Sequence, residues 1–309
     1  MRKTAINCVY KLAKKDEKVV FVGSDLSPNL LGEMKEEFPD RYYMEGIMEM
    51  GVVGMAAGLA MEGFKPYVNT ISTFLTRRCY EQNVIDLGLH KLPVKLIANG
   101  GGYVYAPLGP THQAIEDFAI MRAIPNMTVT SVCDSDEMER LMEKSKDWNL
   151  PLYIRLGKGG DPIISKEHRG FEIGKAIDMI DDYQTKTDVL LISTGIVTNH
   201  TQQASLKLME KGISCRHLHF HTIKPFDSEK LIEAVKKTKI LATVEEHTLI
   251  GGLSSAVLEC LVDNQTPVPK TIRFGIPDKF SENYGSQEML LKSVGICPEN
   301  IYKKIYNEC

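Results

Sequence analysis

One carboxyl group, that of Glu49, lies in a stretch (residues 42–66) that is otherwise rich in glycine, methionine and small apolar residues. Met48 and Met50 flank it directly. Burial among apolar side chains disfavours the charged form of a carboxyl group, because the charge loses its contact with water. We therefore expect Glu49 to be a catalytic proton donor.

The residues around and after Glu49 have the spacing of a helix, which we expect over residues 47–62. Apolar residues recur at helical intervals, and three glycines form a second stripe beside them. A glycine in a helix costs up to about 1 kcal/mol relative to alanine, so three of them indicate a surface that another backbone approaches closely. The apolar stripe is Val52, Val53, Ala56, Ala57 and Ala60, and the glycines are Gly51, Gly54 and Gly58. We expect a subunit interface here.

Three other segments place polar or aromatic residues where predicted strands end, over residues 23–29, 70–82 and 99–113. Ligands of open parallel sheets usually bind at this edge. The third segment has three consecutive glycines that let backbone N–H groups approach a ligand, but it lacks the lysine of a P-loop. From their residues alone, the three segments could equally be a capped turn, a core phenylalanine and a surface loop, in that order.

Alternating strands and helices must position these segments. Strand patterns cover residues 19–23, 67–71, 94–98, 128–132 and 152–156, and helical patterns cover 1–14, 47–62, 73–88, 112–124 and 135–147. This alternation predicts a parallel sheet covered by helices on both faces. We expect a first domain at residues 1–160.

A second α/β unit follows a segment rich in glycine, proline and charge. That segment, residues 161–187, reads as a linker with at most a short strand. Strands are expected at 189–193, 214–220, 240–244 and 270–274, and helices at 199–211, 228–237 and 252–262. The fold class is therefore α/β, with two tandem domains of mainly parallel sheets, the second at residues 188–309.

The composition excludes several classes of partner. The chain has 309 residues and a net charge of -3, with no basic footprint for nucleic acid or an anionic membrane surface. Its longest apolar run is well short of the roughly 20 residues that span a bilayer. The seven cysteines show no metal-binding spacing, and the N-terminus does not resemble a secretion signal, so we expect reduced thiols in a cytoplasmic protein.

The segment Gly46-Ile47-Met48-Glu49, followed by a Gly/Ala-rich helix, resembles the glutamate motif of the transketolase family, whose cofactor is thiamine diphosphate. The resemblance implies that Glu49 protonates the aminopyrimidine ring of the cofactor. The segment at residues 72–77 resembles the S-T-F-L-x-R stretch of 1-deoxy-D-xylulose-5-phosphate synthase. This implies that Phe74 stacks on the pyrimidine and that Arg77 belongs to the cofactor site.

Other motifs extend the resemblance to the substrate. Residues 23–29 are similar to a transketolase segment beside the thiazolium ring, which implies that Asp25 binds the cofactor and Asn29 the substrate. Arg2 lies upstream of Asp25 at a distance along the sequence that matches an arginine of the family, and that arginine contacts the sugar phosphate. The ending Gly-Pro-Thr-His-Gln at residues 109–113 implies that His112 faces the substrate, where a histidine can relay protons.

The chain departs from the family where sugars are bound. Asn99 and Gly100 replace a histidine-containing segment, Leu108 replaces an acidic residue, and Lys158 stands where an arginine usually binds phosphate. A lysine cannot form the same bidentate clamp. The resemblance therefore implies an altered sugar substrate, with predicted contacts to Arg2, Asn29, Gly100, Tyr103, Tyr105 and Lys158. The two tyrosines could equally pack the loop.

The second domain resembles the transketolase C-terminal domain through residues 223–227 and 245–253. That domain implies self-association. His217, His219 and His221 alternate along one predicted strand and could indicate a metal site, but no fourth ligand is evident. We predict no metal site in this chain.

What the sequence lacks indicates a divided enzyme. In this superfamily a separate domain with a Gly-Asp-Gly motif holds the diphosphate and Mg²⁺ of the cofactor, and no such motif occurs here. The resemblance implies the C-terminal subunit of a split transketolase, in an α2β2 assembly with an N-terminal subunit that binds Mg²⁺. It would transfer a two-carbon ketol unit from a ketose to an aldose.

Three alternatives remain open at this stage. The β subunit of a 2-oxo acid dehydrogenase has the same layout, although residues 111–113 favour a transketolase. A half of a deoxyxylulose phosphate synthase is favoured by residues 74–77 and disfavoured by Leu108. A non-catalytic partner subunit is disfavoured by the presence of Glu49 with Phe74 and His112.

Overall fold

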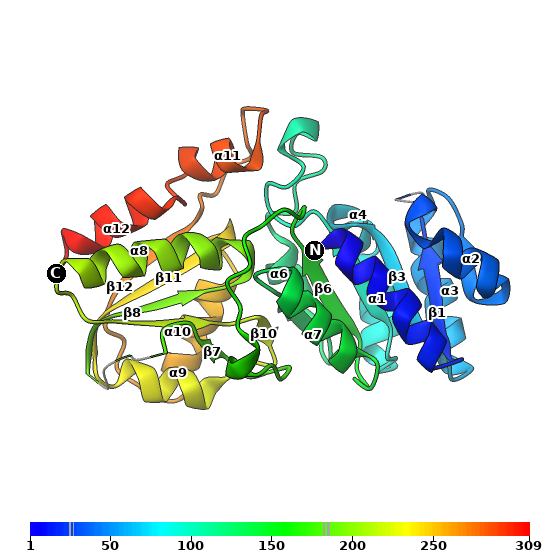
Figure 1. Cartoon of the computed structure of the whole chain (residues 1–309), viewed down its shortest axis with the longest axis horizontal. Helices are drawn as coiled ribbons and strands as arrows, with labels where there is room; N and C mark the ends of the chain where they lie inside the picture. The colour runs from blue at the N-terminus through cyan, green and yellow to red at the C-terminus, as the bar shows by residue number, and fades with distance from the viewer. Residues whose placement is uncertain (25, 27, 182, 184–185) are drawn as a thin grey trace.

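Two sheets organise the chain, one of seven strands and one of five, each lined by helices (Figure 1). The computed structural model describes residues 1–24, 26, 28–181, 183 and 186–309, and only the backbone at residues 28 and 29. The predicted cofactor residue Asp25 and the side chain of Asn29 therefore lie outside the described part of the chain. The two tandem α/β units with mainly parallel sheets confirm the predicted fold class.

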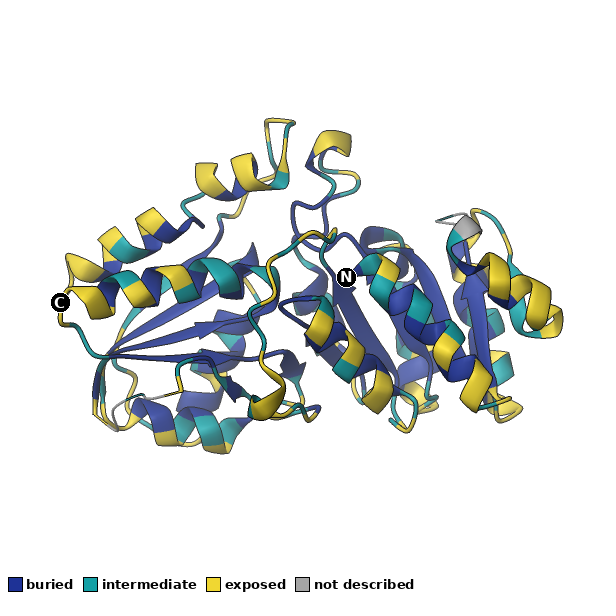
Figure 2. Cartoon of the chain, in the orientation of Figure 1, coloured by how far each residue is buried: buried dark blue, intermediate teal, exposed yellow. Residues whose placement is uncertain are grey.

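The first sheet has the order β10-β5-β6-β4-β3-β1-β2. All of its neighbouring pairs are parallel except β10 and β5, which are antiparallel. Its strands are β1 (Val19–Gly23), β2 (Tyr42–Met44), β3 (Lys65–Ile71), β4 (Lys95–Asn99), β5 (Thr128–Ser131), β6 (Leu152–Leu156) and β10 (Thr222–Lys224). The central strands are apolar and buried on both faces, as expected for a parallel sheet between helical layers (Figure 2).

Helices cover both faces of this sheet. One face packs against α1 (Arg2–Lys15), α2 (Gly32–Glu37) and α7 (Ser135–Ser145). The other face packs against α3 (Glu49–Met61), α4 (Ser72–Thr76), α5 (Tyr80–Gln82), a π-helix (Asn83–Leu89) and α6 (Asp117–Ala123). Short 3-10 turns lie at Pro28–Leu31, Pro39–Arg41, Ala106–Leu108, Glu167–Arg169 and Gly195–Val197.

The second sheet has the order β12-β11-β8-β9-β7, and only β7 runs antiparallel to its neighbour. Its strands are β7 (Ile177–Asp178), β8 (Thr187–Ser193), β9 (Cys215–His219), β11 (Thr238–Thr248) and β12 (Lys270–Ile276). One face carries α8 (Thr198–Glu210), α11 (Gln287–Ser293) and α12 (Pro298–Tyr306). The other carries α9 (Ser228–Val235) and α10 (Leu253–Asp263).

Two expected helices differ from the structure. The helix expected over residues 73–88 is broken into α4, α5 and the π-helix, with Cys79 outside helical geometry at φ -106° and ψ 21°. The helix expected over residues 112–124 begins only at Asp117. Its first five residues instead form a loop, because Ala114 exchanges backbone hydrogen bonds with Gly102, at 2.8 and 3.2 Å.

The two domains share elements rather than meeting at a simple joint. β10 comes from the second half of the sequence, yet it pairs with β5 in the first sheet. In the predicted linker, β7 pairs with β9 in the second sheet. Arg155, at the end of β6, donates from Nη2 to the carbonyl oxygens of Ala114 and Glu246, at 2.8 and 2.9 Å. Backbone pairing and buried polar contacts thus join the two halves.

Candidate functional site

Glu49 is the first residue of α3, and its side chain is only 2% exposed. Its carboxylate Oε2 lies 2.6 Å from Nη1 of Arg78. A carboxylate in the first turn of a helix is also favoured by the helix dipole. The expected purely apolar surroundings are therefore wrong, because Met48 and Met50 are about half exposed and an arginine is the nearest charged partner.

Phe74 lies between Arg78 and His112. The guanidinium carbon of Arg78 is 4.2 Å from the centroid of the Phe74 ring. The imidazole of His112 meets the same ring edge-on, with centroids 5.3 Å apart. Glu49, Phe74 and His112, which come from three separate motifs, are thus joined by one chain of contacts at the carboxyl edge of the first sheet.

Sequence reasoning missed Arg78. The signal for it was present, since Arg78 follows Phe74 by four residues, a spacing that brings side chains together on a helix. The adjacent Arg77 was chosen instead, and it pairs with Glu116 at 2.9 Å and donates to the carbonyl of Gln113 at 3.1 Å. Arg77 therefore braces the loop that carries His112, and its contact with the cofactor stays a prediction.

The loop of residues 99–113 holds His112 in place. Gly100, Gly102 and Gly109 have φ values of +80°, +60° and +78°, a region that favours glycine. The carboxylate of Glu246, from β11, accepts a hydrogen bond from the backbone N–H of Tyr103 at 2.8 Å. Burial raises the pKa of Glu246 to about 7. The second domain thus supports the loop that carries His112 directly.

The two tyrosines of this loop have different surroundings. Tyr103 is 2% exposed and packs into the apolar core of the second domain. Tyr103 therefore packs the loop, which was the alternative to sugar binding, since its buried ring presents no surface to a sugar. The ring of Tyr105 instead lies over Gly100, where an added Cβ would be 2.1 Å from the ring.

Three of the predicted substrate residues come together around Tyr105. Burial raises the pKa of the Tyr105 hydroxyl, and the charge of Arg2 and its hydrogen bond to the hydroxyl oppose this rise. Arg2, Gly100 and Tyr105 therefore lie side by side at the carboxyl end of β4. Lys158 follows β6 and is exposed.

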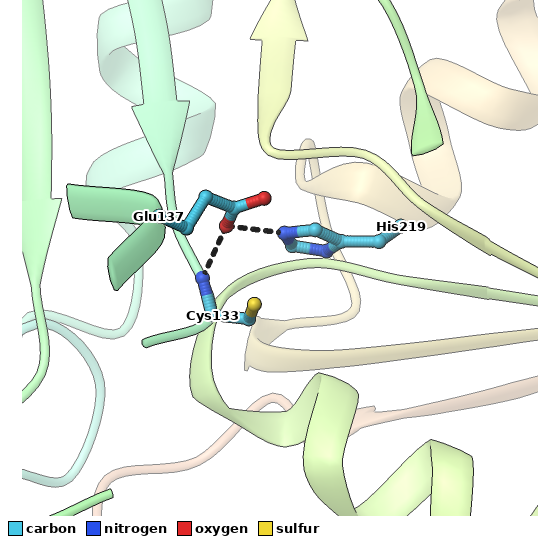
Figure 3. A group of neighbouring side chains, drawn as sticks. All are labelled: Cys133, Glu137 and His219. Carbon is cyan, nitrogen blue, oxygen red and sulfur yellow. Dashed lines mark hydrogen bonds and ion pairs between the residues drawn. The ribbon is translucent and has the colours of Figure 1, made fainter. Parts of the chain in front are cut away.

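A buried polar cluster is formed by Cys133, Glu137 and His219 (Figure 3). Glu137 belongs to α7, which covers the face of the first sheet opposite to α3 and Glu49. Oε2 of Glu137 accepts from the Cys133 backbone N–H at 2.7 Å and lies 2.9 Å from Nε2 of His219. Nδ1 of His219 has a second partner, the hydroxyl of Thr198, at 2.9 Å. A metal ion held by Cys133, Glu137 and His219 would have to displace these contacts, so the cluster acts as a hydrogen-bonded brace between the domains.

The other predicted histidines have separate partners. Nε2 of His217 contacts the hydroxyl of Ser193 at 2.7 Å. His221 stacks on Phe171 with ring centroids 4.2 Å apart. His221 lies beyond the end of β9 and meets His219 edge-on, with ring centroids 5.9 Å apart. Buried packing and hydrogen bonding therefore account for these histidines.

The described residues fit one half of thiamine diphosphate. The buried carboxylate of Glu49 and the half-buried ring of Phe74 suit a planar group that stacks on the ring and donates N–H groups to the carboxylate. The planar guanidinium of Arg78 occupies this position in the structure. No comparable set is found among the described residues for the Mg²⁺ that accompanies the diphosphate. Among the described residues the one group of three clustered metal-ligand side chains is Cys133, Glu137 and His219, which lacks the oxygen-rich set that Mg²⁺ prefers.

Comparisons with known proteins match both domains. The family model described as "Transketolase, pyrimidine binding domain" matches residues 1–160, and "Transketolase, C-terminal domain" matches residues 181–301. The chain is 35% identical over 302 residues to one of the subunits of an apulose-4-phosphate transketolase from Phocaeicola vulgatus, covering 96% of this chain and 95% of that protein. It is 32% identical to the 6-deoxy-6-sulfo-D-fructose transketolase subunit SqwH of Clostridium sp. (strain MSTE9), covering 98% and 92%.

One solved structure is similar over nearly the whole chain. It is described as a split gene transketolase in an inactive beta4 tetramer. The TM-score is 0.87 at 31% identity, and the match covers 99% of this chain and 96% of the other.

Proposed function

The chain belongs to the transketolase family, and from this premise we propose that it is the C-terminal subunit of a split, thiamine-diphosphate-dependent transketolase. The reaction would transfer a two-carbon ketol unit from a ketose to an aldose. The observation that carries the proposal is the contact chain from Glu49 through Arg78 and Phe74 to His112. It brings an acid, a stacking ring and an imidazole to one edge of the sheet.

Each of these residues has a distinct role in the proposed mechanism. When bound, thiamine diphosphate supplies the carbanion chemistry of ketol transfer. Glu49 would bind the pyrimidine ring through Oε2 and serve as its proton donor, and Phe74 would stack on that ring. Nδ1 of His112 lies 2.8 Å from the hydroxyl of Thr111, which leaves Nε2 to move a proton of a sugar hydroxyl.

A partner subunit would bind the other end of the cofactor. The sequence contains no Gly-Asp-Gly motif, and Gly160-Asp161 is followed by Pro162. We infer that a separate N-terminal chain holds the diphosphate and Mg²⁺ in an α2β2 enzyme. The names of the two relatives, which are subunits of transketolases, support a divided enzyme.

Self-association of this chain would use the outer face of α3 and the residues just before it. Ile47, Met48, Met50 and Met61 are all more than half exposed there, although large apolar side chains are usually buried. Gly51 and Gly58 lie exposed on the same helix, where a second backbone could approach closely. The beta4 assembly of the similar solved structure supports association between copies.

The substrate would be an unusual or modified sugar. Both relatives carry the names of such sugars, apulose 4-phosphate and 6-deoxy-6-sulfo-D-fructose. In this chain Arg2, Tyr105 and Lys158 would form the sugar-binding edge, and a lysine at position 158 would contact an anionic group through a single point charge. Asn29 remains a predicted contact of the substrate, and Asp25 a predicted contact of the cofactor.

The seven cysteines carry no disulfide, and six of them are buried. Free thiols are typical of a reducing compartment, which supports our proposal of a cytoplasmic enzyme. As a separate finding, no helix in the described part of the chain has the length and apolar character to cross a bilayer.

The function can be tested by co-expressing the chain with a candidate N-terminal subunit and measuring ketol transfer with a panel of ketoses and aldoses. We expect Glu49→Ala to lower kcat/KM on the order of 10²- to 10⁴-fold, the usual contribution of a positioned acid. Glu62→Ala, at the exposed far end of the same helix, is the matched control and should retain activity. Full activity of Glu49→Ala would falsify the proposed mechanism and favour a non-catalytic subunit. Decarboxylation of 2-oxo acids instead of ketol transfer would favour the dehydrogenase alternative.

A further inference from the structure

The guanidinium of Arg78 occupies a position for which the proposed function requires a different group. It contacts the carboxylate of Glu49 and covers the ring of Phe74 at the same time. These two residues are the ones that we expect to hold the pyrimidine ring of the cofactor. We propose that Arg78 is a placeholder for this ring, which fills the pyrimidine site in the unloaded chain and leaves it when the cofactor binds.

The chemical likeness of the two groups supports this inference. A guanidinium is planar, stacks on aromatic faces and donates N–H groups to a carboxylate. An aminopyrimidine is also planar and offers N–H groups at its edge. The short distance to Glu49, 2.6 Å, and the stacking distance to Phe74, 4.2 Å, leave no space for a second ring against both residues. One group therefore excludes the other.

Arg78 can leave this position without breaking the fold. Its side chain is 40% exposed, whereas that of Glu49 is 2% exposed. Among the described residues, Arg78 contacts Glu49 and Phe74. The neighbouring Arg77 is different, because Glu116 and the carbonyl of Gln113 hold it. A free arginine is well solvated, so rotation of Arg78 outward costs mainly its two local contacts.

The placeholder has a physical purpose in an enzyme of two chains. A buried carboxylate without a partner is strongly destabilising. While the chain is separate from the cofactor, Arg78 neutralises Glu49 and keeps the Phe74 ring in one orientation. The site is thus formed before loading, and the exchange of Arg78 for the pyrimidine keeps the carboxylate paired throughout.

This inference depends on the proposed function, and its test separates the two. The titration uses thiamine diphosphate with Mg²⁺, followed by calorimetry, in the complex with the N-terminal subunit. Arg78→Ala removes the group that competes with the cofactor for Glu49 and Phe74, so we expect cofactor binding to tighten on the order of tenfold. The matched control is Arg41→Ala, which removes an arginine stacked on Phe38 at 3.9 Å, away from the site, and should leave the affinity unchanged.

The outcomes are distinct. Tighter binding by Arg78→Ala alone supports the placeholder. Unchanged or weaker binding overturns it and makes Arg78 a supporting residue of the loaded site, while the proposed function stands. If the wild-type complex binds no cofactor at all, the proposed function fails and this inference fails with it.

A second measurement serves if Arg78→Ala does not fold. The wild-type complex is treated with phenylglyoxal, an arginine reagent, and the modification of each arginine is measured by peptide mass spectrometry. We expect Arg78 to react faster after cofactor loading, because its guanidinium moves from the stacked position into solvent, whereas Arg41 reacts equally in both states. An unchanged or slower reaction of Arg78 contradicts the exchange.

Discussion

Gly102 lies where the loop of residues 99–113 contacts Glu246 of the second domain, and Gly102→Ala tests how that support works. Gly102 has φ +60°, and a Cβ added there would lie 2.3 Å from Cδ of Glu246. The carboxylate of Glu246 cannot stay where it is in this variant. It would have to leave the backbone N–H of Tyr103 and the side chain of Gln287, both now at 2.8 Å.

The expected cost has two parts. An alanine in the left-handed region is unfavourable by roughly 1–2 kcal/mol. Moving the carboxylate leaves buried polar groups without partners, at about 1–3 kcal/mol each. With one such group orphaned, the free energy of unfolding should fall by about 2–5 kcal/mol. The transketolase activity of the complex should fall as well, because the loop carries His112.

The matched control is Gly212→Ala. Gly212 has φ +80° and no neighbouring atom within 4 Å of an added Cβ, so it reports the backbone cost alone. Urea unfolding of the two variants and the wild type gives the difference. A third variant, Glu246→Ala, removes the obstructing carboxylate. In that background Gly102→Ala should cost no more than Gly212→Ala does, because only the backbone part remains.

Equal destabilisation by Gly102→Ala and Gly212→Ala in the wild-type background would refute the reasoning. So would a full cost of Gly102→Ala when Glu246 is absent. Either result would mean that Glu246 moves aside freely and does not support the loop.

Three further predictions concern charge and assembly. Burial opposes ionisation of Glu137, but His219 and hydrogen bonds hold its pKa at about 2, below the ordinary 4.5. The stability that this carboxylate contributes is therefore present above pH 4.5 and is lost as the pH falls toward 2. Urea unfolding across this range should show a smaller loss of stability for Glu137→Gln than for the wild type. Burial lowers the pKa of Lys95 from 10.5 to about 7. Between pH 7 and 10.5 the unfolded chain therefore binds one proton more than the folded chain, and the free energy of unfolding should rise with pH. Lys95→Met should remove this rise. Gly58→Arg should shift the chain to smaller assemblies in light scattering, whereas Gly32→Arg, also helical, exposed and open around its Cβ, should not.

Local patterns were enough to predict much of the fold. The strands β1, β3, β4 and β6 are short apolar runs between turn residues, and their neighbours in the sheet are all parallel, so the pattern and the pairing agree. The position of Glu49 at a helix start was also predictable, because the glycine and apolar stripes begin there.

Contacts between distant segments were not predictable in the same way. The burial of Tyr103 depends on the core of the second domain, which lies more than 80 residues further along the chain. The helix expected to begin at His112 starts at Asp117 because Ala114 pairs with Gly102, a contact that local spacing does not indicate. The pairing of Glu49 with Arg78 was missed because the two residues come from separate segments, and local spacing indicates only the contact of Arg78 with Phe74.

The pairing of β10 with β5 limits how the gene of such a protein can be divided or recombined. A gene cut between the two domains would leave the first sheet with an open edge at β5, a surface prone to stray association. Recombination that exchanged one domain for a foreign copy would have to replace this strand as well. The two halves of this chain therefore depend on each other to complete the first sheet.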